Sequence, residues 1–226
     1  MKYTILISVL FALFSKPFIV LAQKDTTKRF FFSSGIGPVY SFFQLAIPPF
    51  AYFNAGEYSA ADKRLLGRAI DFEIGYQLSK GTSLSVRFSD HKYANNLKIN
   101  DTIRNTNYLY SVQSKLYTHQ YHWQLLVNKV FIQKKNHSLG GGIGLFLFDE
   151  HRQGIDANPA NPGGTSDPTV YFIEYASWEL GAPICLFYEK KLNENISFGA
   201  RMQVNFLISA PDLYAMSLVP YLRVNF

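Results

Sequence analysis

Six charged residues stand at positions that alternate with apolar ones, and their charges balance. They are the acids Asp71, Glu73 and Glu179 and the arginines Arg87, Arg201 and Arg223. A charge removed from water without a partner is strongly destabilising. We therefore expect these carboxylates and guanidinium groups to neutralise one another in one interior. The alternative is that these groups, together with His122, form a polar ligand site or a gated path for ions or a small solute. Clustered ionisable groups also mark conduction routes.

The histidines suggest two further kinds of chemistry. His119 and His122 are three residues apart, so on a strand they point to opposite faces and cannot hold one metal ion together. The acid-acid-histidine segment 149–151 has a composition that solvated loops share. An acyl hydrolase needs a hydroxyl nucleophile beside an imidazole, but the same-face neighbours of His119 are tyrosines. A set that uses Ser111 or Ser114 as the nucleophile remains the alternative for acyl hydrolysis. We expect no metal ligands, no cofactor and no enzymatic activity.

The elements that must position these residues are strands, because apolar residues recur at every second position. In residues 70–78 every even position is apolar, and a Lys80-Gly81 turn separates this segment from the alternating residues 83–89. Residues 196–208 and 216–226 show the same pattern. Period-two alternation predicts strands with one apolar face and one polar face.

Eight such strands are predicted, and short and long connections alternate between them. The strands lie at approximately 29–43, 64–79, 82–93, 114–132, 137–148, 170–190, 195–208 and 215–226. The long connections are 44–63, 94–113 and 149–169, with a shorter fourth at 209–214. Short turns at one end and long loops at the other are typical of transmembrane barrels. The sequence therefore predicts an all-β, eight-stranded, antiparallel up-and-down transmembrane β-barrel.

A secreted β-sandwich would also alternate, and three prolines complicate either fold. A sandwich hides its apolar face between two sheets, but here the opposite face carries the six charged residues named above. Pro38, Pro183 and Pro220 fall within predicted strands. Because proline cannot donate a hydrogen bond to the ladder, we expect bulges or strand ends there.

Composition and the first residues predict an exported membrane protein. Of 226 residues, 17% are charged and 16% aromatic, whereas soluble domains are about 25% charged. The mean hydropathy of −0.02 excludes a helical protein with many membrane spans. The net charge is +6, but the basic residues are scattered, which argues against nucleic-acid binding. Residues 1–22 have a basic start, an apolar run and a small residue before Gln23, as a cleaved signal peptide does, which leaves a barrel domain at 23–226.

With these residues in place, the chain resembles the small outer-membrane β-barrel proteins of Gram-negative bacteria. The resemblance covers about Arg29 to Phe226, and the ending 221–226 resembles the signal that the barrel-assembly machinery recognises. The junction Ala22-Gln23 is similar to those of Bacteroidetes-type proteins. The resemblance implies an outer-membrane location, contact with outer-membrane lipid and lipopolysaccharide, long loops outside the cell and short turns in the periplasm.

The number of strands limits what the interior can do. An eight-stranded bore is filled by side chains or holds one small ligand, so a general aqueous channel is not expected. The first hypothesis is a barrel with a plugged polar lumen and a structural or interaction role through its external loops. The alternatives are a barrel that binds or passes one small amphipathic ligand, and a lipid A-modifying acyl hydrolase. Loop 44–63 is too apolar for a solvated loop, so it either covers the mouth or contacts a protein partner or lipid.

Overall fold

The computed structural model describes residues 29–42, 58–60, 65–79, 81–102, 109–158, 169–209 and 213–226. The predicted signal peptide and most of loop 44–63 lie outside the described residues. The strands are β1 (Phe30–Ser41), β2 (Tyr58–Ala60), β3 (Leu65–Ser79), β4 (Thr82–Thr102), β5 (Leu109–Lys134), β6 (His137–Asn158), β7 (Thr169–Lys191), β8 (Ile196–Leu207) and β9 (Leu213–Asn225). In this part of the chain no helix is long and apolar enough to cross a membrane.

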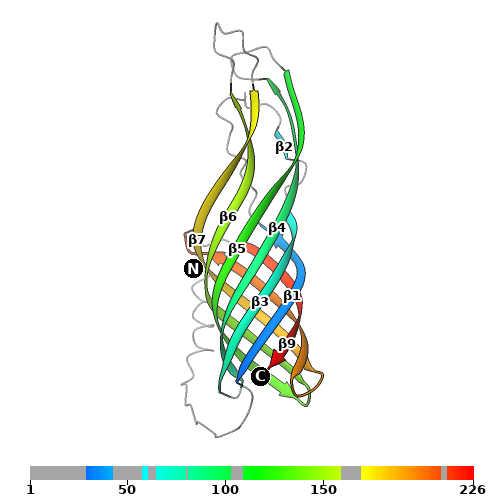
Figure 1. Cartoon of the computed structure of the whole chain (residues 1–226), viewed down its shortest axis with the longest axis vertical. Helices are drawn as coiled ribbons and strands as arrows, with labels where there is room; N and C mark the ends of the chain where they lie inside the picture. The colour runs from blue at the N-terminus through cyan, green and yellow to red at the C-terminus, as the bar shows by residue number, and fades with distance from the viewer. Residues whose placement is uncertain are drawn as a thin grey trace, which may run out of the picture.

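All strands except β2 close into one antiparallel barrel with tilted strands (Figure 1). From β3 to β9 each strand pairs with the next along the chain, and β1 pairs with both β3 and β9. Within the ring every barrel strand therefore has a partner on both sides, which leaves no open edge there. The short β2 pairs with the far part of β4 and is not a member of the ring. The predicted eight-stranded barrel is confirmed.

Four neighbouring strands are longer than predicted. The pairing of β4 with β5 continues to Thr102 opposite Leu109, and that of β6 with β7 to Asn158 opposite Thr169. The predicted loops 94–113 and 149–169 are therefore wrong over much of their length, and these extensions form the upper end of the molecule in Figure 1. Beyond the apolar wall a strand pair has no bore to fill and no lipid-facing wall to form. The apolar–polar alternation that marks a buried face is then no longer required.

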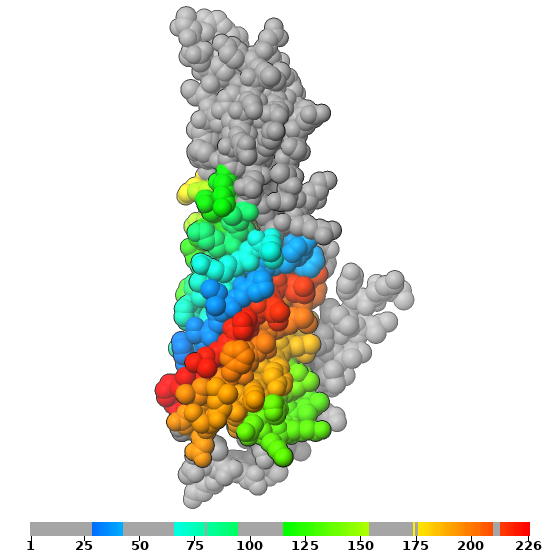
Figure 2. Space-filling view, turned by 90° about the vertical axis from the view of Figure 1, so that its right-hand side faces the viewer, coloured from blue at the N-terminus to red at the C-terminus, as the bar shows by residue number. Residues whose placement is uncertain are grey.

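Side chains alternate between the bore and the outer wall. On β4 the inward Arg87 is 1% exposed and the outward Val86 is 54% exposed. On β3 the inward Glu73 is 2% exposed and the outward Ile74 is 63% exposed. The wall formed by β1, β9 and β8, which faces the viewer in Figure 2, presents the apolar side chains Phe32, Ile36, Phe198, Met202, Leu218 and Leu222. A polar interior inside an apolar exterior is the reverse of a water-soluble protein.

The three prolines interrupt ladders but produce no bulges. Pro38 and Pro220 lie at the seam between β1 and β9, where the register skips residues 36–38. Pro183 lies in a similar gap between β6 and β7. Each proline keeps its place opposite the strand on its other side, so the missing N–H weakens one ladder only. The expected bulges or strand ends at these prolines are therefore wrong; the register shifts of the described strands lie elsewhere.

Gly144 on β6 lies where two backbones approach closely. A Cβ atom there would overlap the carbonyl oxygen of Leu125, whereas at Gly141 the nearest atom would be a ring carbon of Phe131 at 3.0 Å. We expect Gly144→Ala to lower the free energy of unfolding by about 1–3 kcal/mol, and Gly141→Ala to lower it by less, because a ring can move. Urea titration of the folded barrel in detergent, followed by tryptophan fluorescence, measures both. Equal unfolding midpoints would contradict the close approach.

Candidate functional site

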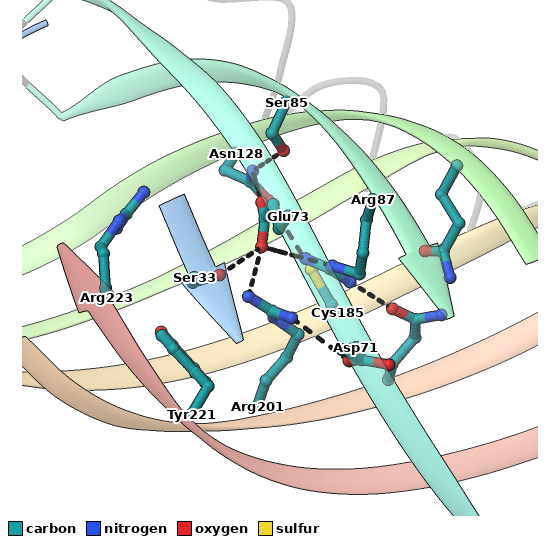
Figure 3. A network of polar contacts seen from close by, with 12 residues as sticks. Ser33, Asp71, Glu73, Ser85, Arg87, Asn128, Cys185, Arg201, Tyr221 and Arg223 are labelled. Atoms are coloured by element: carbon teal, nitrogen blue, oxygen red, sulfur yellow. Dashed lines mark hydrogen bonds and ion pairs between the residues drawn. The ribbon is translucent and has the colours of Figure 1, made fainter. Parts of the chain in front are cut away.

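The bore of the barrel contains a connected group of charged and polar side chains, most of which Figure 3 shows. They come from seven of the eight barrel strands, because alternation turns every second side chain inward. We call them the lumen cluster: Ser33, Asp71, Glu73, Ser85, Arg87, Asn128, Cys185, Glu189, Arg201, Gln203, Tyr221 and Arg223.

Glu73 lies at the centre of the lumen cluster, between two guanidinium groups. Its Oε2 accepts hydrogen bonds from Nη2 of Arg87 at 3.1 Å and Nε at 3.3 Å. Nη2 of Arg201, on β8, donates to the same oxygen. Ser33 Oγ donates to Oε2 at 3.3 Å, and Asn128 Nδ2 donates to Oε1 at 3.4 Å. One buried carboxylate therefore connects β1, β3, β4, β5 and β8.

Asp71 and Gln203 complete the surroundings of the two arginines. Arg201 Nη1 donates to Asp71 Oδ2 at 3.4 Å, and Arg87 Nη1 donates to Gln203 Oε1 at 2.5 Å. Two carboxylates thus face two guanidinium groups, and the formal charge of the centre is zero. The structure brings together Asp71, Glu73, Arg87 and Arg201, and an interior with little water requires such neutralisation.

Arg223 lies at the lower edge of the lumen cluster and pairs with a residue that the sequence analysis missed. Its Nη1 is 2.5 Å from Oε1 of Glu189, and Tyr221 Oη donates to the same oxygen at 2.7 Å. The guanidinium carbon of Arg223 lies 3.5 Å from the centre of the Phe31 ring. The alternation of the predicted strand 170–190, followed to its end, is the signal that could have identified Glu189.

Two of the predicted residues lie outside the lumen cluster. Glu179 lies toward the upper end, where its Oε2 accepts a hydrogen bond from Ser209 Oγ at 2.7 Å. His122 is buried in the bore but packs against rings, with its centroid 4.2 Å from that of His91 and 5.4 Å from that of Phe148. Neither ring nitrogen of His122 has a hydrogen-bond partner among the described residues. Glu189, and not Glu179, therefore pairs with the third arginine.

An apolar layer fills the bore toward the upper end. Its members are Val39, Ala69, Tyr93, Phe146, Phe148, Leu207, Tyr214, Ala215 and Val219. Phe148 stacks on Tyr214 with ring centroids 5.1 Å apart, and Tyr214 Oη donates to Glu150 at 3.2 Å. The bore is thus occupied in succession by ion pairs, by packed rings and by polar groups near the mouth.

In the described residues no serine or threonine hydroxyl is hydrogen-bonded to a histidine ring; the hydroxyl beside an imidazole is the phenol of Tyr188, 2.5 Å from His137 Nδ1. His119 lies on the outer wall with its Nδ1 3.9 Å from Oδ1 of Asp90, and this nitrogen has no hydrogen-bond partner. In the same part of the chain, no group of three or more His, Cys, Asp or Glu side chains could hold a metal ion. The side chains of Ser111 and Ser114 lie outside the described residues.

The closed ring, its polar bore and its apolar outer wall define a class of fold, the small closed antiparallel β-barrel. No protein-family model matches the chain, and no curated protein matches its sequence. Among solved structures it is similar to Neisserial surface protein A (NspA), with a TM-score of 0.53 and 12% identity over 87% of this chain and 97% of that one. At this identity the similarity concerns the fold alone.

Two further solved structures align over similar lengths with lower scores. Ail of Yersinia pestis has a TM-score of 0.47 and 11% identity over 88% of this chain and 99% of that one. The N-terminal β-barrel domain of Pseudomonas aeruginosa OprF has a TM-score of 0.43 and 14% identity over 88% of this chain and 98% of that one.

Glu73→Gln removes the negative charge that faces two arginines and keeps the size of the side chain. Two guanidinium groups would then share the bore with Asp71 alone, so we expect the free energy of unfolding to fall by about 3–5 kcal/mol. Glu179→Gln is the matched control outside the lumen cluster, with an expected change below about 1 kcal/mol. Urea midpoints in detergent measure both variants. Similar midpoints would show that Glu73 does not hold the lumen cluster together.

Proposed function

We propose that the protein is an integral outer-membrane β-barrel with a plugged bore and a structural or interaction role exerted at its upper end. The observation that carries this proposal is the inverted polarity of the barrel: Arg87 and Glu73 are buried, while Ile74 and Leu125 are exposed. An apolar wall is favourable in contact with hydrocarbon. Because hydrocarbon offers no hydrogen-bond partners, every backbone N–H and C=O group must be hydrogen-bonded within the protein, which a closed barrel achieves. Export by a signal peptide and a Bacteroidetes-type source are further parts of the proposal.

The apolar wall is too large and continuous for a surface in water. Exposed large apolar side chains occur on all eight barrel strands, among them Phe32, Ile74, Val86, Leu125, Leu145, Leu186, Met202 and Leu218. A soluble monomer seldom exposes a contiguous apolar patch of more than a few hundred Å². Trp123 and Trp178 are also outward and exposed, and tryptophan is enriched where hydrocarbon meets headgroups. The wall therefore supports contact with lipid around the whole barrel.

The contents of the bore support a plug. An eight-stranded barrel has room for little more than its own side chains, and here both the lumen cluster and the apolar layer occupy that room. Opening a path through the lumen cluster would separate Glu73 from Arg87 and Arg201, which are held by several hydrogen bonds. A buried charge that loses its partner is strongly destabilised, so the closed arrangement is favoured.

The parts outside the apolar wall support a role in interaction. The extensions of β4, β5, β6 and β7 add paired strands beyond the wall, and β2 adds a further strand against β4. We propose that this upper end contacts another macromolecule, and that loop 44–63 takes part as a partner site. At the lower end, Leu222 and Phe226 are exposed, which supports recognition of this segment by the barrel-assembly machinery.

A second candidate function is the binding of one small ligand within the bore. His91 Nδ1, both ring nitrogens of His122 and Tyr93 Oη are buried and have no hydrogen-bond partner in the described part of the chain. Buried polar groups are usually paired, so these atoms favour a polar molecule between the lumen cluster and the mouth. Water molecules held at the same place in a plugged barrel would also provide hydrogen-bond partners for these atoms, and that arrangement involves no transport.

Leu125→Arg places a charge on the outer wall near the middle of the apolar zone. If this wall faces hydrocarbon, the substitution should lower the free energy of unfolding of the protein in phospholipid vesicles by about 2–4 kcal/mol. Leu125→Ile is the control and should change it little. Urea titrations in vesicles measure both. A variant as stable as the control, or a wild-type protein that stays soluble without detergent, would exclude a lipid-facing wall.

A plugged bore predicts that the reconstituted protein does not conduct. In planar lipid bilayers we expect the folded protein to add no ion current above that of the lipid, because the lumen cluster and the apolar layer fill the cross-section. Folding is checked on detergent gels, where a compact barrel migrates differently before and after boiling. Reproducible current that depends on an added small solute would contradict the plug and favour the second candidate.

A further inference from the structure

At the upper border of the apolar wall, the outward basic side chains of the described residues lie on three adjacent strands. On β1, β8 and β9, the strands that face the viewer in Figure 2, the outward side chains are apolar, small or tyrosine and none is charged. On β3, β4 and β5, by contrast, Arg68, Lys92 and Lys115 lie outward. A general preference for basic residues at the membrane boundary would distribute them around the ring. At the lower end, outward basic side chains occur on β5 and β7, at Lys129 and Lys190. It is the upper group, on three adjacent strands, that favours a specific site.

Two of the three basic side chains lie over one aromatic ring, and the third lies opposite one of them. Arg68 lies directly opposite Lys92 in the register of β3 and β4. Lys92 Nζ is 5.2 Å from the centroid of the Tyr117 ring, and Lys115 Nζ is 5.7 Å from the same centroid. The two ammonium groups are therefore no more than about 11 Å apart. We call Arg68, Lys92, Lys115 and Tyr117 the basic-aromatic site.

No carboxylate of the described residues neutralises the basic-aromatic site. Of the nearby outward acids, Asp149 lies 3.0 Å from His151. Asp90, two residues from Lys92 on the same face, lies 3.9 Å from His119 and forms no ion pair with a lysine or arginine of the described residues. Arg68, Lys92 and Lys115 form no ion pair within the described part of the chain. Like charges directly opposite each other on neighbouring strands are destabilising, so Arg68 and Lys92 favour an external anion between them.

The surface beside the basic-aromatic site limits what this anion can be. On the same strands, beyond the outward Asp90, His119 and Tyr121, the side chains toward the lower end are apolar: Ile70, Phe72, Val86, Phe88, Trp123 and Leu125. A ligand with a phosphate at the basic groups and hydrocarbon along these side chains fits both parts of the surface. A free anion would use only the first part, and a nucleic acid could not use the second.

We infer that the basic-aromatic site binds the phosphorylated headgroup of an anionic lipid in the outer leaflet, with the acyl chains along β3, β4 and β5. This inference rests on the proposed membrane location and adds a specific lipid site to it. Guanidinium and ammonium groups both bind phosphate, the first through two parallel hydrogen bonds and the second as a point charge. Arg68 can thus orient the headgroup while Lys92 and Lys115 supply charge.

The test uses the full-length mature protein folded in a neutral detergent, with bisphosphorylated lipid A as the probe and its dephosphorylated form as the comparison. A basic residue near an anionic lipid surface contributes about a fivefold change in affinity. We therefore expect the double variant Lys92→Gln/Lys115→Gln to bind the phosphorylated probe at least about tenfold more weakly. Lys129→Gln, which removes an outward charge near the opposite end of β5, should bind as the wild type does. Native mass spectrometry or fluorescence titration gives the affinities.

Three results would overturn the inference. They are equal affinity of the double variant and the Lys129 control, equal affinity for the dephosphorylated probe, and displacement of lipid A by inorganic phosphate at equal concentration, which would indicate a site for free anions. The gel shift on boiling is recorded for every variant. A wild-type protein that shows no shift and needs no detergent contradicts the proposed function, whereas a folded barrel that lacks the phosphate preference contradicts this inference alone.

Discussion

Closure of the backbone hydrogen-bond network is the constraint on which the rest of the structure depends. The pairing of β4 with β5 completes a ring that β3, β1, β9, β8, β7 and β6 otherwise leave open. Because each strand then has two partners within the ring, no backbone edge remains there to be satisfied by water. Closure also decides which side chains meet. Arg201 reaches Glu73, which is 128 residues away in the sequence, because their strands face each other across the bore.

The width of the closed ring explains the order of its contents. Eight strands leave no room for a column of water around each charge, so every charged group in the bore must find a partner at its own level. Glu73 does so between Arg87 and Arg201, and Glu189 does so beside Arg223. Where no such pairs form, packed rings fill the bore. The charges in the bore are therefore neutralised by local pairs at each level. The equal number of acids and arginines predicted to line the bore does not by itself show which groups pair.

The outer wall follows a different rule, because lipid surrounds it and its two sides need not be alike. The outer face of β1, β8 and β9 is uncharged, whereas the outer face of β3, β4 and β5 carries Arg68, Lys92 and Lys115, of which the two lysines lie over Tyr117. Two strands of this second side, β4 and β5, continue beyond the wall, as do the next two strands, β6 and β7. The same half of the barrel thus bears both the charged border and the extensions, which makes it the side on which contacts outside the hydrocarbon are concentrated.

Alternation is a local property, so the sequence by itself determined the number of barrel strands, their antiparallel order and the inward direction of Asp71, Glu73 and Arg87. Two things depended on the tertiary structure. Strand ends beyond the wall could not be predicted, because paired strands there need no apolar face. The position of each inward residue along the barrel axis could not be predicted either. Glu179 and Glu189 point inward on the same strand, and only the stagger of the closed ring places Glu189 beside an arginine and Glu179 near the mouth.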